Sequence, residues 1–113
     1  DWCYAIVEPA RTQQGFRVYN PQYSGPEVAE KKPPIPASDL YSIGRVMLHL
    51  LGGDMQTGDM PDSVDAKLQR FVRYLTRTSP LQRAQDAWEM FSELGRLRGQ
   101  IYGPHRFQEF VVP

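Results

Sequence analysis

The segment from Leu40 to Leu51 constrains the fold most, because most of its residues are large and apolar. Only Ser42, Arg45 and His49 interrupt it, at spacings of three and four that form one narrow polar stripe on a helix. A helix that is apolar almost all round is buried by its neighbours, and this one is too short to cross a bilayer. Ser38 and Asp39 supply an N-cap and a first-turn acid, and two glycines follow the segment. The pattern predicts a buried central helix over 38–52, with His49 as a hydrogen-bonded core histidine.

Two further helices are predicted towards the C-terminus. Over 63–78, one face carries apolar side chains and the other carries Arg70, Arg73 and Arg77, which is typical of a solvated helix face. Over 83–102 we expect an inward face that includes Trp88 as a core residue; its members are Ala87, Trp88, Phe91, Leu94, Leu97 and Ile101. Residues 53–62 form a loop and 103–113 a tail. The fold class is therefore mainly α.

The N-terminal quarter carries little helical signal. Short strands are expected over 3–7 and 15–19, with one or two helical turns over 26–32 after a proline at the first helical position. The chain starts at Asp1 in a dense apolar string and ends in an apolar segment, from which we expect a piece of a larger protein.

Composition excludes several functional classes. Thirteen basic residues balance thirteen acidic ones, so non-specific electrostatic binding to nucleic acid or to a membrane surface is not expected. One cysteine and two histidines are too few for a zinc site, and the acidic residues of the 53–62 loop lack calcium-loop spacing. A single cysteine fits a reducing compartment, which predicts a cytoplasmic location.

Four spaced motifs, in the order of the family, resemble those of protein kinases. Residues 19–27 (Tyr-Asn-Pro-Gln-Tyr-Ser-Gly-Pro-Glu) resemble Gly-Thr-Pro-x-Tyr-x-Ala-Pro-Glu, and 39–44 resemble the Asp-x-Trp-Ser-x-Gly that opens the central helix of the kinase C-lobe. Residues 75–83 resemble the later Leu-x-x-Asp-Pro-x-x-Arg block, and Asp1-Trp2-Cys3 falls where kinases carry Asp-Phe-Gly. The resemblance implies the C-terminal half of a kinase-like C-lobe, with the magnesium loop, activation segment and P+1-like loop over 1–27.

The resemblance also implies residue roles. Glu27 would pair with Arg83 inside the lobe, and Asp39 would accept hydrogen bonds from the catalytic loop, giving three structural residues. Asn20 and Tyr23 would line the substrate groove. Asp1 would bind the Mg²⁺ that bridges the phosphates of ATP. No catalytic residue is expected within these 113 positions, since the Gly-rich loop, the strand lysine and the catalytic loop would all precede Asp1.

Departures from the kinase pattern keep alternatives open. Trp2-Cys3 replaces Phe-Gly, and Asn20 replaces the threonine of Ser/Thr kinases. The first hypothesis is a fragment of a Ser/Thr-type kinase that uses Mg²⁺ and ATP in the intact parent, with neither cofactor and no activity expected for this chain alone. The second is a pseudokinase or kinase-derived binding module, and the third an unrelated helical interaction domain. Expected partners are the missing N-terminal part of the domain, a protein substrate or partner, and a second copy of the chain.

Overall fold

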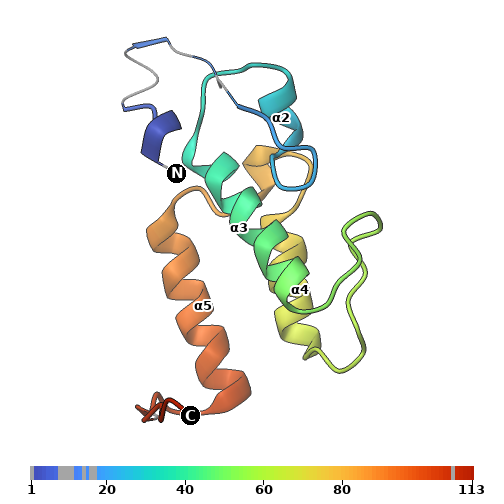
Figure 1. Ribbon diagram of the computed structural model, residues 1–113, viewed down its shortest axis with the longest axis vertical. Coiled ribbons are helices and arrows are strands. Elements are labelled where there is room, and N and C mark those ends of the chain that lie inside the picture. Colours follow the sequence, from blue (N-terminus) through green and yellow to red (C-terminus); the bar gives the residue numbers. More distant parts are fainter. Residues whose placement is uncertain (1, 8–11, 14, 16–17, 108) are drawn as a thin grey trace.

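The described part of the chain is mainly helical, as predicted. The computed structural model describes residues 2–7, 12–13, 15, 18–107 and 109–113. Within them lie α2 (Pro26–Ala29), α3 (Pro36–Leu50), α4 (Ala66–Leu75) and α5 (Ala87–Tyr102), with single 3₁₀ turns η1 (Trp2–Tyr4) and η2 (Pro80–Gln82), and no strand (Figure 1).

The strands predicted in the N-terminal region are wrong wherever the structure describes it. Residues 2–4 form the η1 turn, and residues 5–7, 15, 18 and 19 are irregular; residues 16 and 17 lie outside the described residues. A short isolated strand pair is marginally stable unless it joins a larger sheet, and the described residues offer none. The short helix expected over 26–32 is a single turn that ends at Ala29.

Helix α3 begins two residues earlier than predicted. Ile35 is extended, at φ −129° and ψ 155°, and Pro36 opens the helix, because its missing N–H would have no helical partner there. Ser38 and Asp39 therefore lie in the first turn and neither is the N-cap. The predicted stop is present, since Gly52 adopts φ +75° and its N–H donates to the carbonyl of His49 at 3.0 Å.

Side-chain caps set the starts of the next two helices. Asp65 Oδ1 accepts the N–H of Lys67 at 2.8 Å, and Asp86 Oδ1 accepts the N–H of Glu89 at 2.7 Å. Both helices are therefore shorter than the predicted 63–78 and 83–102. Arg83 falls in extended backbone between η2 and α5 rather than at a helix start.

The core lies where α3, α4 and α5 meet (Figure 1). One cluster joins all three helices, and a smaller cluster lies beneath the 53–62 loop; their buried members are Leu40, Phe71, Leu75, Ala84 and Leu97 in the first and Leu48, Met60 and Val72 in the second. Gly44 lets α3 approach α4 closely, because a Cβ there would stand 2.8 Å from the Leu75 Cβ and from the Thr76 Cγ2.

Two predicted core assignments are wrong. Helix α3 is not buried all round: Ile43, Val46 and Leu50 are exposed, and so is His49. On α5, Trp88 and Phe91 are exposed, whereas Leu94, Leu97 and Ile101 pack inward. Helices α3 and α5 each carry more apolar surface than their neighbouring helices cover. One apolar face of each helix therefore packs in the core, and a second face remains exposed. Among the described residues no helix combines the length and apolarity needed to cross a bilayer.

Candidate functional site

A buried ion pair joins the segment before α3 to the segment after α4. Arg83 Nη1 donates to Glu27 Oε1 at 2.7 Å and Nη2 donates to Glu27 Oε2 at 3.0 Å. Arg83 is 2 % exposed and Glu27 6 %. The structure thus brings together the two residues that the resemblance pairs, and it does so in the two-pronged geometry in which guanidinium and carboxylate match best.

Every donor of the Arg83 guanidinium is used. Besides the two bonds to Glu27, Nη1 donates to the Ala37 carbonyl at 3.1 Å, Nη2 to the Thr78 carbonyl at 3.0 Å, and Nε to the Arg77 carbonyl at 2.6 Å. The guanidinium also lies over the Tyr41 ring, 4.6 Å from its centroid. A single side chain therefore links α2, the start of α3 and the turn after α4.

The electrostatics of the pair favour a charged Glu27. Burial alone raises the pKa of this carboxyl, but the hydrogen bonds from Arg83, with help from the backbone of Glu27 itself, outweigh burial and hold the pKa below its ordinary value of 4.5. Gly25 makes room for the carboxylate, since a Cβ at this position would stand 2.6 Å from both oxygens.

The loop over 20–25, which includes the predicted substrate residues Asn20 and Tyr23, is a self-bonded turn. The Asn20 carbonyl accepts the N–H of Tyr23 at 3.2 Å and that of Ser24 at 2.8 Å, and the Asn20 N–H donates to Ser24 Oγ at 2.9 Å. Asn20 Oδ1 accepts the N–H of Gln22 at 3.0 Å. The amide oxygen of Asn20 is thus already engaged within its own turn.

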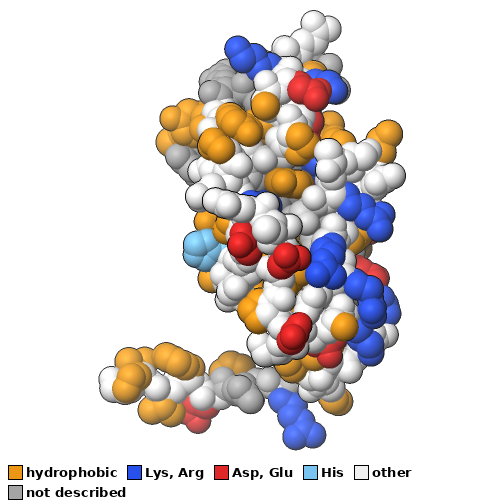
Figure 2. Space-filling model, turned by 90° about the vertical axis from the view of Figure 1, so that its right-hand side faces the viewer, with side chains coloured by type: hydrophobic (Ala, Val, Ile, Leu, Met, Phe, Trp, Pro, Cys, Tyr) orange, Lys and Arg blue, Asp and Glu red, His pale blue; other side chains and the backbone are white. Residues whose placement is uncertain are grey.

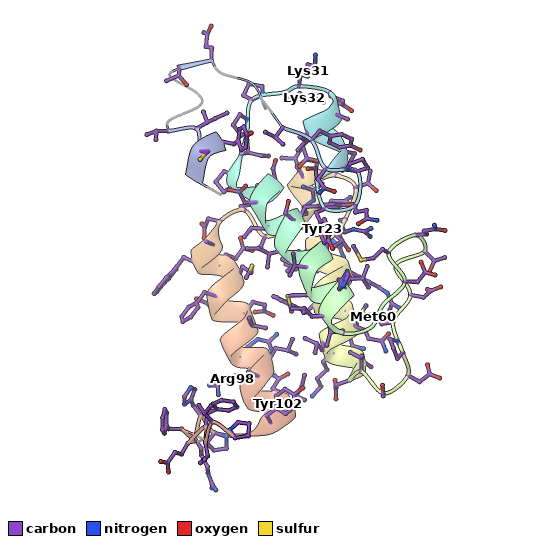
Figure 3. All side chains as sticks on the ribbon, viewed as in Figure 1. Tyr23, Lys31, Lys32, Met60, Arg98 and Tyr102 are labelled. Carbon is purple, nitrogen blue, oxygen red and sulfur yellow. The ribbon has the colours of Figure 1, made fainter. Side chains whose placement is uncertain are left out.

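Two polar residues of α3 hold this loop against the helix. Arg45 Nε donates to the Gln22 carbonyl at 2.6 Å, and the Tyr23 hydroxyl and His49 Nδ1 lie 3.1 Å apart (Figure 3). Arg45 also donates through Nη2 to the Met55 carbonyl, so it bridges the 20–25 loop and the 53–62 loop. From the sequence, both residues belong to a polar stripe on the helix, and His49 was predicted to be a core histidine. That stripe is the one signal that could have located the loop.

The 53–62 loop is internally bonded as well. Asp54 Oδ1 accepts the N–H groups of Gln56 at 2.6 Å and Thr57 at 3.1 Å, and the backbone N–H of Asp54 donates to the Asp59 carbonyl at 2.8 Å. The N–H groups of Thr57 and Gln56 lower the pKa of the Asp54 carboxyl. These contacts shape a projecting loop over 53–62, where the sequence predicts a loop.

The two remaining predicted site residues are Asp1 and Asp39. Asp1, the predicted magnesium ligand, lies outside the described residues. Asp39 is exposed in the first turn of α3. Within the described ranges, no group of three or more His, Cys, Asp or Glu side chains is placed to hold a metal ion.

One known protein is similar in sequence over most of the chain. The chain is 31 % identical, over an alignment of 104 residues covering 77 % of it, to a protein of Corynebacterium efficiens named "Serine/threonine-protein kinases drp72". The alignment covers 20 % of that protein, so this chain spans about a fifth of its length. No family profile and no solved structure matches. The similarity suggests a kinase-like relationship.

Proposed function

We propose that the chain is the C-terminal part of a Ser/Thr-type protein-kinase-like C-lobe, in a cytoplasmic parent that transfers phosphate from ATP. The observation that carries the proposal is the buried two-pronged pair between Glu27 and Arg83. The pair joins Glu27, in the segment that resembles Ala-Pro-Glu, to Arg83, the last residue of the segment that resembles Leu-x-x-Asp-Pro-x-x-Arg. The similarity to a protein named as a Ser/Thr kinase supports the same assignment.

The exposed apolar face of α3 supports an incomplete lobe. Ile43, Val46 and Leu50 follow helical spacing of three and four and remain exposed beside the core. In the proposed parent, the N-terminal part of the lobe covers this face, and the 20–25 loop contributes to the protein-substrate groove. Burying the parts of these three side chains that are still exposed would stabilise the assembly by about 2–5 kcal/mol, since complete burial of one such side chain contributes roughly 1.5–3 kcal/mol.

The described residues do not fit a nucleotide–magnesium site by themselves. Asp1 is a single carboxylate, and Mg²⁺ sites need further oxygen ligands from protein or phosphate. We therefore assign no phosphoryl-transfer step to this chain, and we expect it to be inactive alone. Mg²⁺ and ATP belong to the proposed intact parent.

The experiment is to read the coding sequence upstream of Asp1 and express the longer protein. We expect a strand lysine and a His-Arg-Asp-type loop, and ATP-dependent phosphate transfer that an Asp1→Asn variant abolishes. The 113-residue chain serves as the inactive control. Transfer by that chain alone, or an upstream sequence unrelated to kinases, would contradict the proposal.

A pseudokinase or binding module is the second candidate, and one observation favours it. Asn20 stands where Ser/Thr kinases carry a threonine, and its side-chain oxygen accepts the Gln22 N–H within its own turn. The upstream sequence separates the two candidates, since replacement of the lysine and of the catalytic-loop aspartate would leave a protein-binding role.

A further inference from the structure

Helix α5 carries a second apolar face that nothing in the described part of the chain covers. Trp88 is 75 % exposed, Phe91 66 % and Tyr102 72 %. The Trp88 and Phe91 rings stack on each other, with centroids 5.6 Å apart and planes at 24°. At about 100° per residue, these three side chains fall within one arc of α5, which Arg98 borders on one side and Ser92 on the other, with Glu93 and Gln100 on the far side of the helix.

Two glycines lie on the same face, between the aromatic residues. Gly95 and Gly99 share an arc of about 80° with Trp88, Phe91 and Tyr102. A Cβ placed on either glycine would meet nothing within 4 Å. The face is therefore a flat, backbone-lined surface with aromatic side chains towards both ends. Glycine in a helix interior costs about 0.5–1 kcal/mol relative to alanine, so two on one exposed face weaken the helix unless a close contact uses them.

The face is symmetric about Gly95. Trp88 and Tyr102 lie equally far from Gly95 along the helix, and Phe91 and Gly99 do so as well. When two such helices pack antiparallel with Gly95 at the crossing, Trp88 lies opposite the partner's Tyr102, and Phe91 lies opposite the partner's Gly99. Because a two-fold axis repeats every contact, the Phe91 ring of each chain packs on the open surface at Gly99 of the other chain.

We propose that the chain forms a two-fold dimer through this face of α5, with the two helices antiparallel and crossing at Gly95. The dimer would contain six such aromatic side chains, each with a surface of roughly 150–250 Å² that is already partly buried in the monomer. Their contact would remove on the order of 1,000 Å² of surface from solvent in total. Stable protein–protein interfaces bury at least about 1,200 Å² of surface in total. The interface is therefore at the small end of specific interfaces, and we expect a weak dimer that dissociates on dilution.

The apolar tail is the competing occupant of this face. Phe107, Phe110, Val111 and Val112 are all exposed, and Figure 2 shows apolar side chains at the C-terminal end standing away from the body of the molecule. The tail leaves α5 at Gly103, which has φ +78°, next to Arg98 and Tyr102 (Figure 3). The helix pair accounts for the symmetric spacing about Gly95, whereas a tail bound along α5 does not.

The first test is the molar mass of the 113-residue chain by sedimentation over a dilution series. We expect a shift from twice 13.0 kDa to 13.0 kDa on dilution. Phe91→Ser and Gly95→Leu should each give a monomer at every concentration, with the helical content unchanged because both positions are exposed. Leu50→Ser removes an equally exposed apolar side chain from α3 and should leave the dimer intact, as should a chain shortened to end at His105.

The second test fixes the register. In a Cys3→Ser background, Gly95→Cys places two thiols at the two-fold crossing and should form an intermolecular disulfide rapidly under mild oxidation. Gln100→Cys, on the polar face of α5, should do so far more slowly. A chain that stays monomeric at high concentration overturns the proposal. So does a dimer that survives Phe91→Ser, a dimer lost on shortening the tail, or equal cross-linking at the two cysteine positions. None of these outcomes depends on the proposed kinase relationship.

Discussion

Arg83 and Glu27 stand 56 positions apart in the chain and meet through two parallel hydrogen bonds of 2.7 and 3.0 Å in the interior of the described structure. The same arginine donates to backbone carbonyls of Ala37, Arg77 and Thr78. Because the guanidinium reaches three separate segments, a single side chain ties α2 and the start of α3 to the turn after α4.

Removal of either partner of the pair should destabilise the fold strongly. Glu27→Ala leaves the Arg83 charge buried, and Arg83→Ala leaves the Glu27 carboxylate buried, so each should lower the free energy of unfolding by about 3–5 kcal/mol. The double variant should lose far less than the sum, as urea unfolding of all four chains would show.

The exposed pair Glu93–Arg96 on α5 provides the matched control. Its double-variant cycle should be close to additive, because solvent screens the charges. An additive cycle at Glu27–Arg83, with small single losses, would remove the pair as the organising contact.

The pair should also make stability depend on acid pH. The pKa of Glu27 is lower in the folded chain than its ordinary value of 4.5, so protons bind the unfolded chain more readily. Its contribution is present at neutral pH and is lost as the pH falls from 4.5 through the folded-state pKa.

The measurement is the free energy of unfolding against pH for the native chain and for Glu27→Gln. The native chain should lose its advantage over this variant in that acid window. Glu109→Gln, at an exposed carboxylate of the C-terminal tail, should follow the native curve closely. A gap between the native and Glu27→Gln curves that stays constant down to acid pH would contradict the linkage.

Close contact between α3 and α4 at Gly44 predicts a cost for the smallest side chain. In Gly44→Ala the new methyl group would stand 2.8 Å from Leu75 Cβ and Thr76 Cγ2, so the helices must separate. We expect a loss of about 1–3 kcal/mol in the free energy of unfolding. Ser92→Ala, at an exposed position of α5, should be neutral or slightly stabilising by the same measurement. A stabilised Gly44→Ala would show that the approach is looser than the geometry indicates.

Loss of Arg45 should loosen two loops at once. Arg45→Met removes the hydrogen bonds to the Gln22 and Met55 carbonyls but keeps the length of the side chain. At about 1.5 kcal/mol for a hydrogen bond from a charged group, amide exchange should speed up roughly tenfold in both loops. The reporters are the N–H groups of Ser24 and Gly58, bonded at 2.8 Å to Asn20 and Asp54.

Arg73→Met is the control for that experiment, because Arg73 contacts Gln69 on its own helix. It should leave exchange in both loops unchanged. Faster exchange in only one loop after Arg45→Met would mean that Arg45 does not couple them.

Sequence patterns identified the existence of α3, α4 and α5 but set several boundaries wrongly. Periodicity reports which residues share a face, whereas the ends depend on the residue that satisfies the first free N–H groups. The side chains of Asp65 and Asp86 accept such N–H groups at the starts of α4 and α5. Pro36, which begins α3, has no N–H group that would need an acceptor. Pro36, Asp65 and Asp86 could each have been read as start signals.

The Glu27–Arg83 contact was predicted through the resemblance to kinases and through no local pattern. Nothing in residue spacing connects two positions so far apart, and the carbonyls that complete the site belong to backbone that any residue could supply. Arg45 and His49 were visible as a polar stripe on an apolar helix. Their role required the path of the 20–25 loop, which periodicity does not contain.

The amino-acid sequence by itself determined the mainly α class, the three principal helices and their apolar faces, because these follow from local spacing and from side-chain chemistry. Only the tertiary structure decided which apolar face of α3 and α5 is packed. Each helix offers two such faces, and burial depends on the surface available from the others. Trp88 and His49 are exposed for that reason, while Arg83 is buried because Glu27 and three carbonyls satisfy its charge and all its donors.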